Sequence, residues 1–233
     1  MNHIPISNWP NIPENIYLKE ATSVATDSDD NIYIFNRGEI PMLVFSDDGK
    51  LIDSWGKGEY VRPHGIFIDH DDTLYLVDDG GHFLKKCTKD GKVLMTIGKP
   101  GEPSEWQKGG YFNRPTDVTI DSDGFLYISD GYGNSRIHKF DQLGNHVISW
   151  GKPGTDPGCF NLPHNICLID DNHLWVCDRE NFRVQIFDKE GSFLDQLHFH
   201  RPQSIFRGRG NLEGFILLAE AGTGMHTQEG VPN

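Results

Sequence analysis

The sequence has few cysteines and no long apolar run. Cysteine occurs four times in 233 residues, at Cys87, Cys159, Cys167 and Cys177, and none of them forms a CxxC pair. This spacing argues against a zinc ribbon and against a disulfide framework. No apolar stretch approaches the roughly 20 residues of a membrane-spanning helix, so we predict no membrane partner.

The sequence also lacks an excess of basic residues. It has 21 Lys and Arg against 34 Asp and Glu, a net charge of −13. Binding to a phosphate backbone needs a basic face, so we predict no nucleic-acid partner. The first ten residues, MNHIPISNWP, show neither the charged region nor the apolar region of a secretory signal, and we expect a cytoplasmic protein.

A repeat fills the chain. Its third copy is RPTDVTIDSDGFLYISDGYGNSRIHKFDQLGNHVISWG, and the second and fourth begin RPHGIFID and LPHNICLID. Each copy has four short alternating runs separated by Asp and Gly turns, which is typical of four antiparallel strands. The period of roughly 40–50 residues is that of a propeller blade. We therefore predict an all-β fold with one domain over residues 1–233.

The blades are expected at residues 21–56, 61–98, 112–151 and 160–197, with a partial fifth blade at 198–233. About five blades are thus present, and either a C-terminal truncation or an unusual ring closure would explain the missing strands. Open blade edges would favour self-association with another chain.

One position of the repeat alternates between two kinds of residue. The residue after the frame's proline is His64, Thr116, His164 and Gln203 in successive copies. This residue begins the innermost strand, so we expect it to point at the ring axis. Alternate blades of a six-bladed ring lie about 120° apart, and three histidines there would form a zinc site. The alternative is that His64 and His164 are polar residues that only order the channel. The third histidine of such a site is inferred from the frame and is not seen in the sequence. His226 is a poor candidate for it, because its stretch has loop character and lacks the Pro-His frame.

Further segments carry a family resemblance. The repeat resembles NHL-type propeller repeats. The segments FNRGE, RPHG, DGYGNSRI, LPHN and DRENFRVQIF together resemble the peptidyl-α-hydroxyglycine α-amidating lyases, in that family's order. The resemblance implies a six-bladed ring. It also implies a carbon–nitrogen lyase that cleaves an α-hydroxyglycine-type substrate, a small molecule or peptide, to an amide and glyoxylate.

The resemblance also implies site residues. His64 and His164 match two zinc ligands, Tyr132 matches the active-site base, Arg37 and Arg179 match active-site arginines, and Val24 and Ile66 match positions whose backbone carbonyls hold a structural calcium ion. A metal can polarise the substrate hydroxyl oxygen, and an arginine fork suits a carboxylate.

The sequence departs from this family at two points. Gly133 stands where the extracellular members have a cysteine, which agrees with a reducing compartment or a bacterial relative, and no third Pro-His frame follows. A non-catalytic NHL scaffold that binds a protein partner is therefore the second hypothesis. A gluconolactonase-type hydrolase is the third, and it would need carboxylates where the axial frame has His, Thr, His and Gln.

Overall fold

The computed structural model describes residues 6–222, which form strands, connecting turns and two short 3-10 helices. His226 lies outside the described residues. In chain order the elements are β1 (Ala21–Thr26), β2 (Ile32–Asn36), β3 (Met42–Phe45), β4 (Leu51–Trp55), β5 (Pro63–Ile68), β6 (Leu74–Asp78), β7 (Phe83–Cys87), β8 (Val93–Gly98), β9 (Asp117–Ile120), β10 (Leu126–Asp130), β11 (Arg136–Phe140), β12 (His146–Trp150), β13 (Pro163–Leu168), β14 (Leu174–Asp178), η1 (Arg179–Asn181), β15 (Arg183–Phe187), β16 (Phe193–His198), β17 (Pro202–Arg207), η2 (Gly210–Leu212) and β18 (Ile216–Glu220). Across residues 6–222 the structure contains no helix long and apolar enough to cross a membrane.

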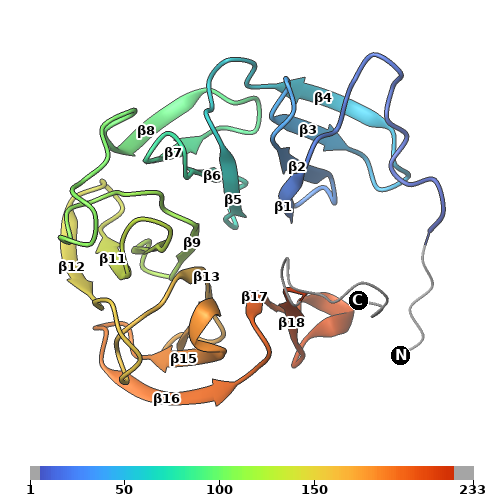
Figure 1. The fold of residues 1–233 in the computed structure, drawn as a ribbon. Helices are drawn as coiled ribbons and strands as arrows, with labels where there is room; N and C mark the ends of the chain where they lie inside the picture. The colour runs from blue at the N-terminus through green and yellow to red at the C-terminus, as the bar shows by residue number, and fades with distance from the viewer. Residues whose placement is uncertain (1–5, 223–233) are drawn as a thin grey trace, which may run out of the picture.

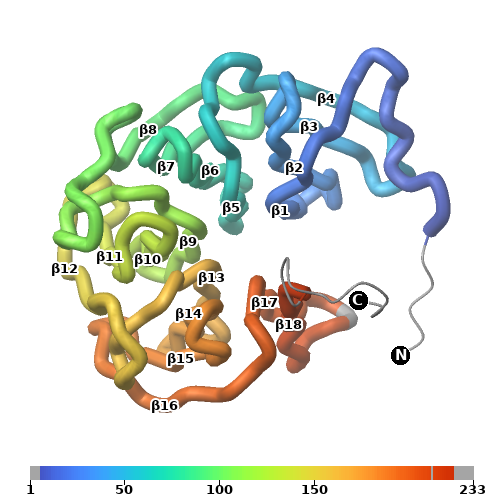
Figure 2. The backbone as a smooth tube through the Cα atoms, in the orientation of Figure 1, coloured from blue at the N-terminus to red at the C-terminus, as the bar shows by residue number. Residues whose placement is uncertain are grey.

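The strands form five antiparallel sheets around a common centre (Figure 1). The first four sheets have four strands each, and in the last sheet the described residues 6–222 supply two strands, β17 and β18. The innermost strands β1, β5, β9, β13 and β17 contact one another in that order. The chain runs round the ring in sequence order (Figure 2). The predicted all-β, propeller-like fold is therefore confirmed.

Burial explains which runs of sequence are most apolar. Each middle strand packs between the two neighbouring sheets, so both of its faces are covered: all five residues of β6 are buried. The outermost strand has one covered face, and β8 exposes Val93 and Leu94 while Ile97 is buried. The outer strands are therefore partly exposed, whereas middle strands such as β6 are buried along their length.

The core lies in apolar layers between successive sheets. One layer joins the first and second sheets through residues such as Phe35 and Leu76, and another joins the third and fourth through Tyr127 and Phe187. The ring of Trp150 lies against Gly191, whose φ of +84° and close approach to the indole leave no room for a side chain. Repeated Trp and Gly positions thus fix the spacing of the blades.

The two ends of the ring differ in how they are covered. The N-terminal segment packs Trp9, Ile16 and Leu18 against the outward face of the first sheet. The last sheet buries Ile205 against the fourth sheet but leaves Leu217 46% exposed. Among residues 6–222, an apolar face is thus left uncovered on β17 and β18. The self-association predicted at open blade edges stays a prediction.

Candidate active site at the ring axis

The two histidines of the alternating frame lie on β-bulges. His64 has no partner in the register between Pro63 and Gly65, and His164 has none between Pro163 and Asn165. A bulge adds one unpaired residue and turns its side chain away from the regular alternation. Proline at the first strand position gives up no ladder hydrogen bond. The Pro-His frame therefore aims both imidazoles at the ring axis.

The two imidazoles meet there. Their ring centroids lie 4.9 Å apart, as the alternation of the frame predicts. His64 Nδ1–H donates to the carbonyl of Thr116 at 2.6 Å, and His164 Nδ1–H donates to the carbonyl of Gln203 at 2.9 Å. Each Nε2 therefore carries a lone pair. Burial is the main cause that lowers the pKa of both rings to about 3, so both are neutral near pH 7.

Tyr132 completes the axial group from the turn after β10. Its hydroxyl oxygen lies 3.1 Å from the Nε2 atom of His64 and 3.1 Å from that of His164. The phenol has one hydrogen to donate, so it can satisfy only one of the two lone pairs at a time. The Gln203 amide approaches the His164 Nε2 atom at 3.3 Å. The structure thus brings Tyr132 to both predicted zinc ligands.

This donor set fits a metal ion. Neutral imidazoles whose other nitrogen is held by a carbonyl are the usual ligands of zinc, because the second hydrogen bond fixes the tautomer and the ring orientation. Two such rings converge here, and within residues 6–222 no third His, Cys, Asp or Glu joins them in a ligand cluster. The residues present therefore fit part of a zinc site.

Arginines surround the mouth of the axial cavity, which has a volume of about 240 Å³ and is lined by Arg37, Arg62, His64, Tyr132 and His164 among others. Arg37 donates to Glu20 at 2.9 Å and to the carbonyl of Pro63 at 3.3 Å. The guanidinium of Arg179 lies 5.9 Å from the centre of the Tyr132 ring. Both predicted arginines thus reach the site.

Two further arginines and an aspartate belong to the same surroundings. Arg62 and Arg114 bind the buried carboxylate of Asp79, and Arg114 lies 4.7 Å from the centre of the Tyr132 ring. Sequence reasoning missed all three. The available signal was an arginine directly before the frame's proline, which occurs at positions 62, 114 and 201.

The predicted calcium positions lie on neighbouring inner strands. Val24 is on β1, with its side chain 62% exposed, and the buried Ile66 is on β5, which contacts β1. Beyond the imidazole pair lies an inner cavity of about 80 Å³, lined by Gly65, Thr116, Asp117, Ser204 and neighbouring residues. Burial raises the pKa of the Asp117 carboxyl to about 7. The calcium site stays a prediction.

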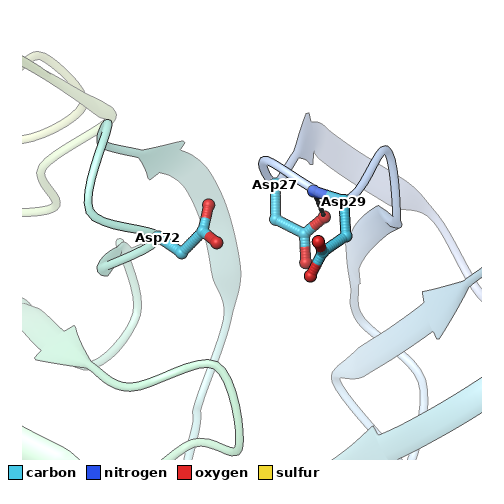
Figure 3. Close-up of side chains that lie close together, drawn as sticks. All are labelled: Asp27, Asp29 and Asp72. Atoms are coloured by element: carbon cyan, nitrogen blue, oxygen red, sulfur yellow. Dashed lines mark hydrogen bonds between the residues drawn. The ribbon is translucent and has the colours of Figure 1, made fainter.

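A cluster of carboxylates lies away from the axis (Figure 3). Asp27 and Asp29, in the turn between β1 and β2, face Asp72, in the turn between β5 and β6. The ammonium of Lys89 lies 3.2 Å, 3.1 Å and 3.0 Å from the three carboxylates, respectively. The protein's own cation therefore occupies this cluster, which joins two blades.

Sequence comparison supports the repeat and the lyase resemblance. The NHL repeat family matches residues 112–140 and 160–187. Human NHL repeat-containing protein 3 is 36% identical over 197 residues, covering 78% of this chain and 55% of that protein. A probable peptidyl-alpha-hydroxyglycine alpha-amidating lyase of Caenorhabditis elegans is 39% identical over 150 residues, covering 63% of this chain and 42% of that protein. The chain thus spans about half the length of these curated relatives, and their activities are proposals for it.

Solved structures agree with the fold. Virginiamycin B lyase from Staphylococcus aureus matches with a TM-score of 0.62 at 16% identity, over 81% of this chain and 60% of that one. A streptogramin B lyase matches with a TM-score of 0.61 at 16% identity, over 86% of this chain and 68% of that one. Identities this low speak for the fold alone. Together, the blades and the sequence matches identify the chain as an NHL repeat protein related to NHL repeat-containing protein 3 and to the peptidyl-α-hydroxyglycine α-amidating lyases.

Proposed function

We propose that the chain is a zinc-dependent lyase that cleaves the N–C bond of an α-hydroxyglycine-type substrate to give an amide and glyoxylate. The observation that carries the proposal is the meeting of two neutral imidazoles with the hydroxyl of Tyr132 at the ring axis. The relationship to the amidating lyases supports the same reaction and suggests a peptide substrate.

His64 and His164 would hold the zinc ion through their Nε2 atoms. When bound, the ion would supply Lewis-acid polarisation of the substrate's hydroxyl oxygen. The carbonyls of Thr116 and Gln203 keep the Nε2 lone pairs of both imidazoles turned toward the axis. The rings therefore need not reorient to bind a metal ion. A structural calcium ion at the carbonyls of Val24 and Ile66 is the second metal of the proposal.

Tyr132 is the proposed base. It takes the proton of the substrate hydroxyl while the C–N electron pair moves to the leaving nitrogen, and it returns a proton to that nitrogen to complete the amide. The carbon that held the hydroxyl becomes the aldehyde carbon of glyoxylate, so atoms and charges balance without a co-reactant. Arg37 and Arg179 would bind the carboxylate of the glycine unit by paired hydrogen bonds.

Metal content and product release test this function. Purified protein should contain zinc and release glyoxylate from N-benzoyl-α-hydroxyglycine. We expect His64→Ala and His164→Ala to lose the bound zinc and the activity together, because each removes one of two converging ligands. The control is His173→Ala, which changes an exposed ring that binds Asp170 in a surface turn. Zinc retained at full occupancy in both axial variants would place the metal elsewhere.

One observation favours the second candidate, a non-catalytic scaffold. The uncovered apolar face of β17 and β18 includes Phe206 at 49% and Leu217 at 46% exposure, and such patches mark protein contacts. Under this hypothesis the purified protein would bind a protein partner through that face and release no glyoxylate.

A further inference from the structure

Arg62, Asp79 and Arg114 form a cluster that the proposed reaction does not use. Asp79 is fully buried, and its two oxygens bind one arginine each: Oδ2 takes Arg62, and Oδ1 takes Arg114 at 3.2 Å. The two arginines come from different blades, directly before β5 and shortly before β9. Asp79 therefore fixes two guanidinium groups from neighbouring blades beside one another.

The charge of this cluster is not balanced within the chain. Arg62 and Arg114 share the one carboxylate of Asp79, so one of the two positive charges has no counter-charge in the cluster. Both arginine side chains are 37% exposed and are therefore partly desolvated. The Arg62 side chain has no hydrogen-bond acceptor other than Asp79 among residues 6–222. The fixed guanidinium groups therefore keep donors available for an anion.

The two arginines proposed to bind the glycine carboxylate also have acidic partners of their own. Arg37 has a carboxylate of its own in Glu20, at 2.9 Å, and lies 3.9 Å from Asp79. Arg179 binds Glu180, at 2.8 Å, and shares that carboxylate with Arg201, at 2.7 Å. The Arg37–Glu20 pair is locally neutral, whereas the Arg62–Asp79–Arg114 cluster carries a net positive charge in a protein whose overall charge is −13.

The cluster also lies beside the reacting group. The guanidinium of Arg114 is 4.7 Å, and that of Arg62 5.6 Å, from the centre of the Tyr132 ring. Arg62 lines the axial cavity together with His64 and His164. An anion bound to the cluster would therefore belong to the same molecule whose hydroxyl faces Tyr132.

We propose that Arg62, Asp79 and Arg114 form a second anion-binding subsite, so that the substrate carries an acidic group in addition to the carboxylate of its glycine unit. This inference rests on the proposed lyase function. It narrows the substrate class to acidic acyl groups, such as an aspartyl or glutamyl side chain near the hydroxyglycine. Asp79 acts through the two arginines and is a positioning residue.

A matched pair of substrates tests the subsite. N-succinyl-α-hydroxyglycine carries the extra carboxylate, and N-succinamoyl-α-hydroxyglycine carries an amide of the same shape. We expect kcat/KM to favour the acid by about 10-fold, the usual size of a charge-assisted hydrogen-bonded contact. In Arg62→Gln and Arg114→Gln the ratio should fall to about one. In Arg207→Gln, which changes an exposed arginine of β17, the ratio should stay as in the wild type.

A binding measurement separates this inference from the lyase itself. N-succinylglycine and N-succinamoylglycine lack the hydroxyl and cannot be cleaved, so calorimetry reports affinity without turnover. A preference for the acid that both glutamine variants abolish supports the subsite even if no glyoxylate is ever released. If a glutamine variant fails to fold, Arg62→Lys and Arg114→Lys keep the charge, lose the planar fork and should retain part of the preference. Equal affinities for both ligands in the wild type, or a preference that survives both glutamine substitutions, would overturn the proposal and leave the lyase untouched.

Discussion

The axial site and the outer carboxylate cluster both contain atoms that could bind a metal, but they differ in whether a cation of the protein lies among those atoms. In the outer cluster, Lys89 stands among three carboxylates and supplies the counter-charge itself. At the axis, His64 and His164 are held neutral with both Nε2 lone pairs turned to one point. This contrast indicates that the proximity of ligand atoms alone is a weak sign of a metal site. What distinguishes the axis is that, among residues 6–222, no cation of the protein fills it.

The inner cavity shows a third arrangement. The carboxyl of Asp117 accepts from the amide of Asn165 and lies against Gly65, without a basic partner among residues 6–222. Burial without a counter-charge favours its protonated form. The three regions thus hold carboxylates paired with a cation, neutral imidazoles, and a carboxyl whose pKa is raised by burial.

The largest effect is expected at the axis, from Tyr132→Phe. The substitution removes the hydroxyl that lies 3.1 Å from each imidazole and leaves the ring's packing. Glyoxylate release should fall by about 10²–10⁴-fold, the usual contribution of a general base. Zinc content should be unchanged, because both Nε2 atoms remain. An active Tyr132→Phe enzyme would exclude the phenol as the base.

The inner cavity should respond to pH. The pKa of the Asp117 carboxyl is raised to about 7, and in the unfolded chain it is about 3.9. Its stabilisation is therefore complete below about pH 4 and is lost as the pH rises through 7. The stability of Asp117→Asn relative to the wild type should thus rise by on the order of 4 kcal/mol from pH 4 to pH 8.

Urea unfolding at several pH values measures this difference. The control is Asp53→Asn, which changes an exposed carboxylate of β4 and should give a difference that does not vary with pH. A flat profile for Asp117→Asn as well would mean that the buried carboxyl is charged throughout.

The smallest effect is expected at the outer cluster. Lys89→Met removes the ammonium and should cost about 1 kcal/mol of stability, the upper range for partly exposed ion pairs. It should also make the melting temperature rise with millimolar calcium chloride by more than in the wild type, because three uncompensated carboxylates then face one another. The matched control is Lys189→Met, where Asp121 and Asp123 form a pair rather than a trio. A calcium response of equal size in the wild type and in Lys89→Met would remove the contrast with the axis.

The repeat made the fold and part of the site predictable. Four strand-like runs per unit with Asp and Gly turns indicate blades, and a fixed frame position indicates which residue faces the axis. His64 and His164 followed from that frame, whereas Tyr132 followed only from the family resemblance, because a turn residue carries no directional signal of its own.

The arginines before the proline were less predictable. Arg62 and Arg114 precede their strands, where a basic residue usually faces solvent. Their direction depends on Asp79, which reads in the sequence as one of many turn aspartates. Whether a turn carboxylate points inward is decided by packing between blades, and a single repeat unit does not contain that information.

The carbonyl that orients His164 belongs to Gln203, in a sheet of two strands where its neighbours have four. Sheets with few ladder partners open locally at low cost. Each such local opening would let the imidazole of His164 rotate and would separate the proposed zinc ligands. If the chain binds zinc as proposed, the lifetime of that zinc should therefore follow the amide hydrogen-exchange rate of β17, because the blade with the fewest strands among residues 6–222 then sets how long the site stays assembled.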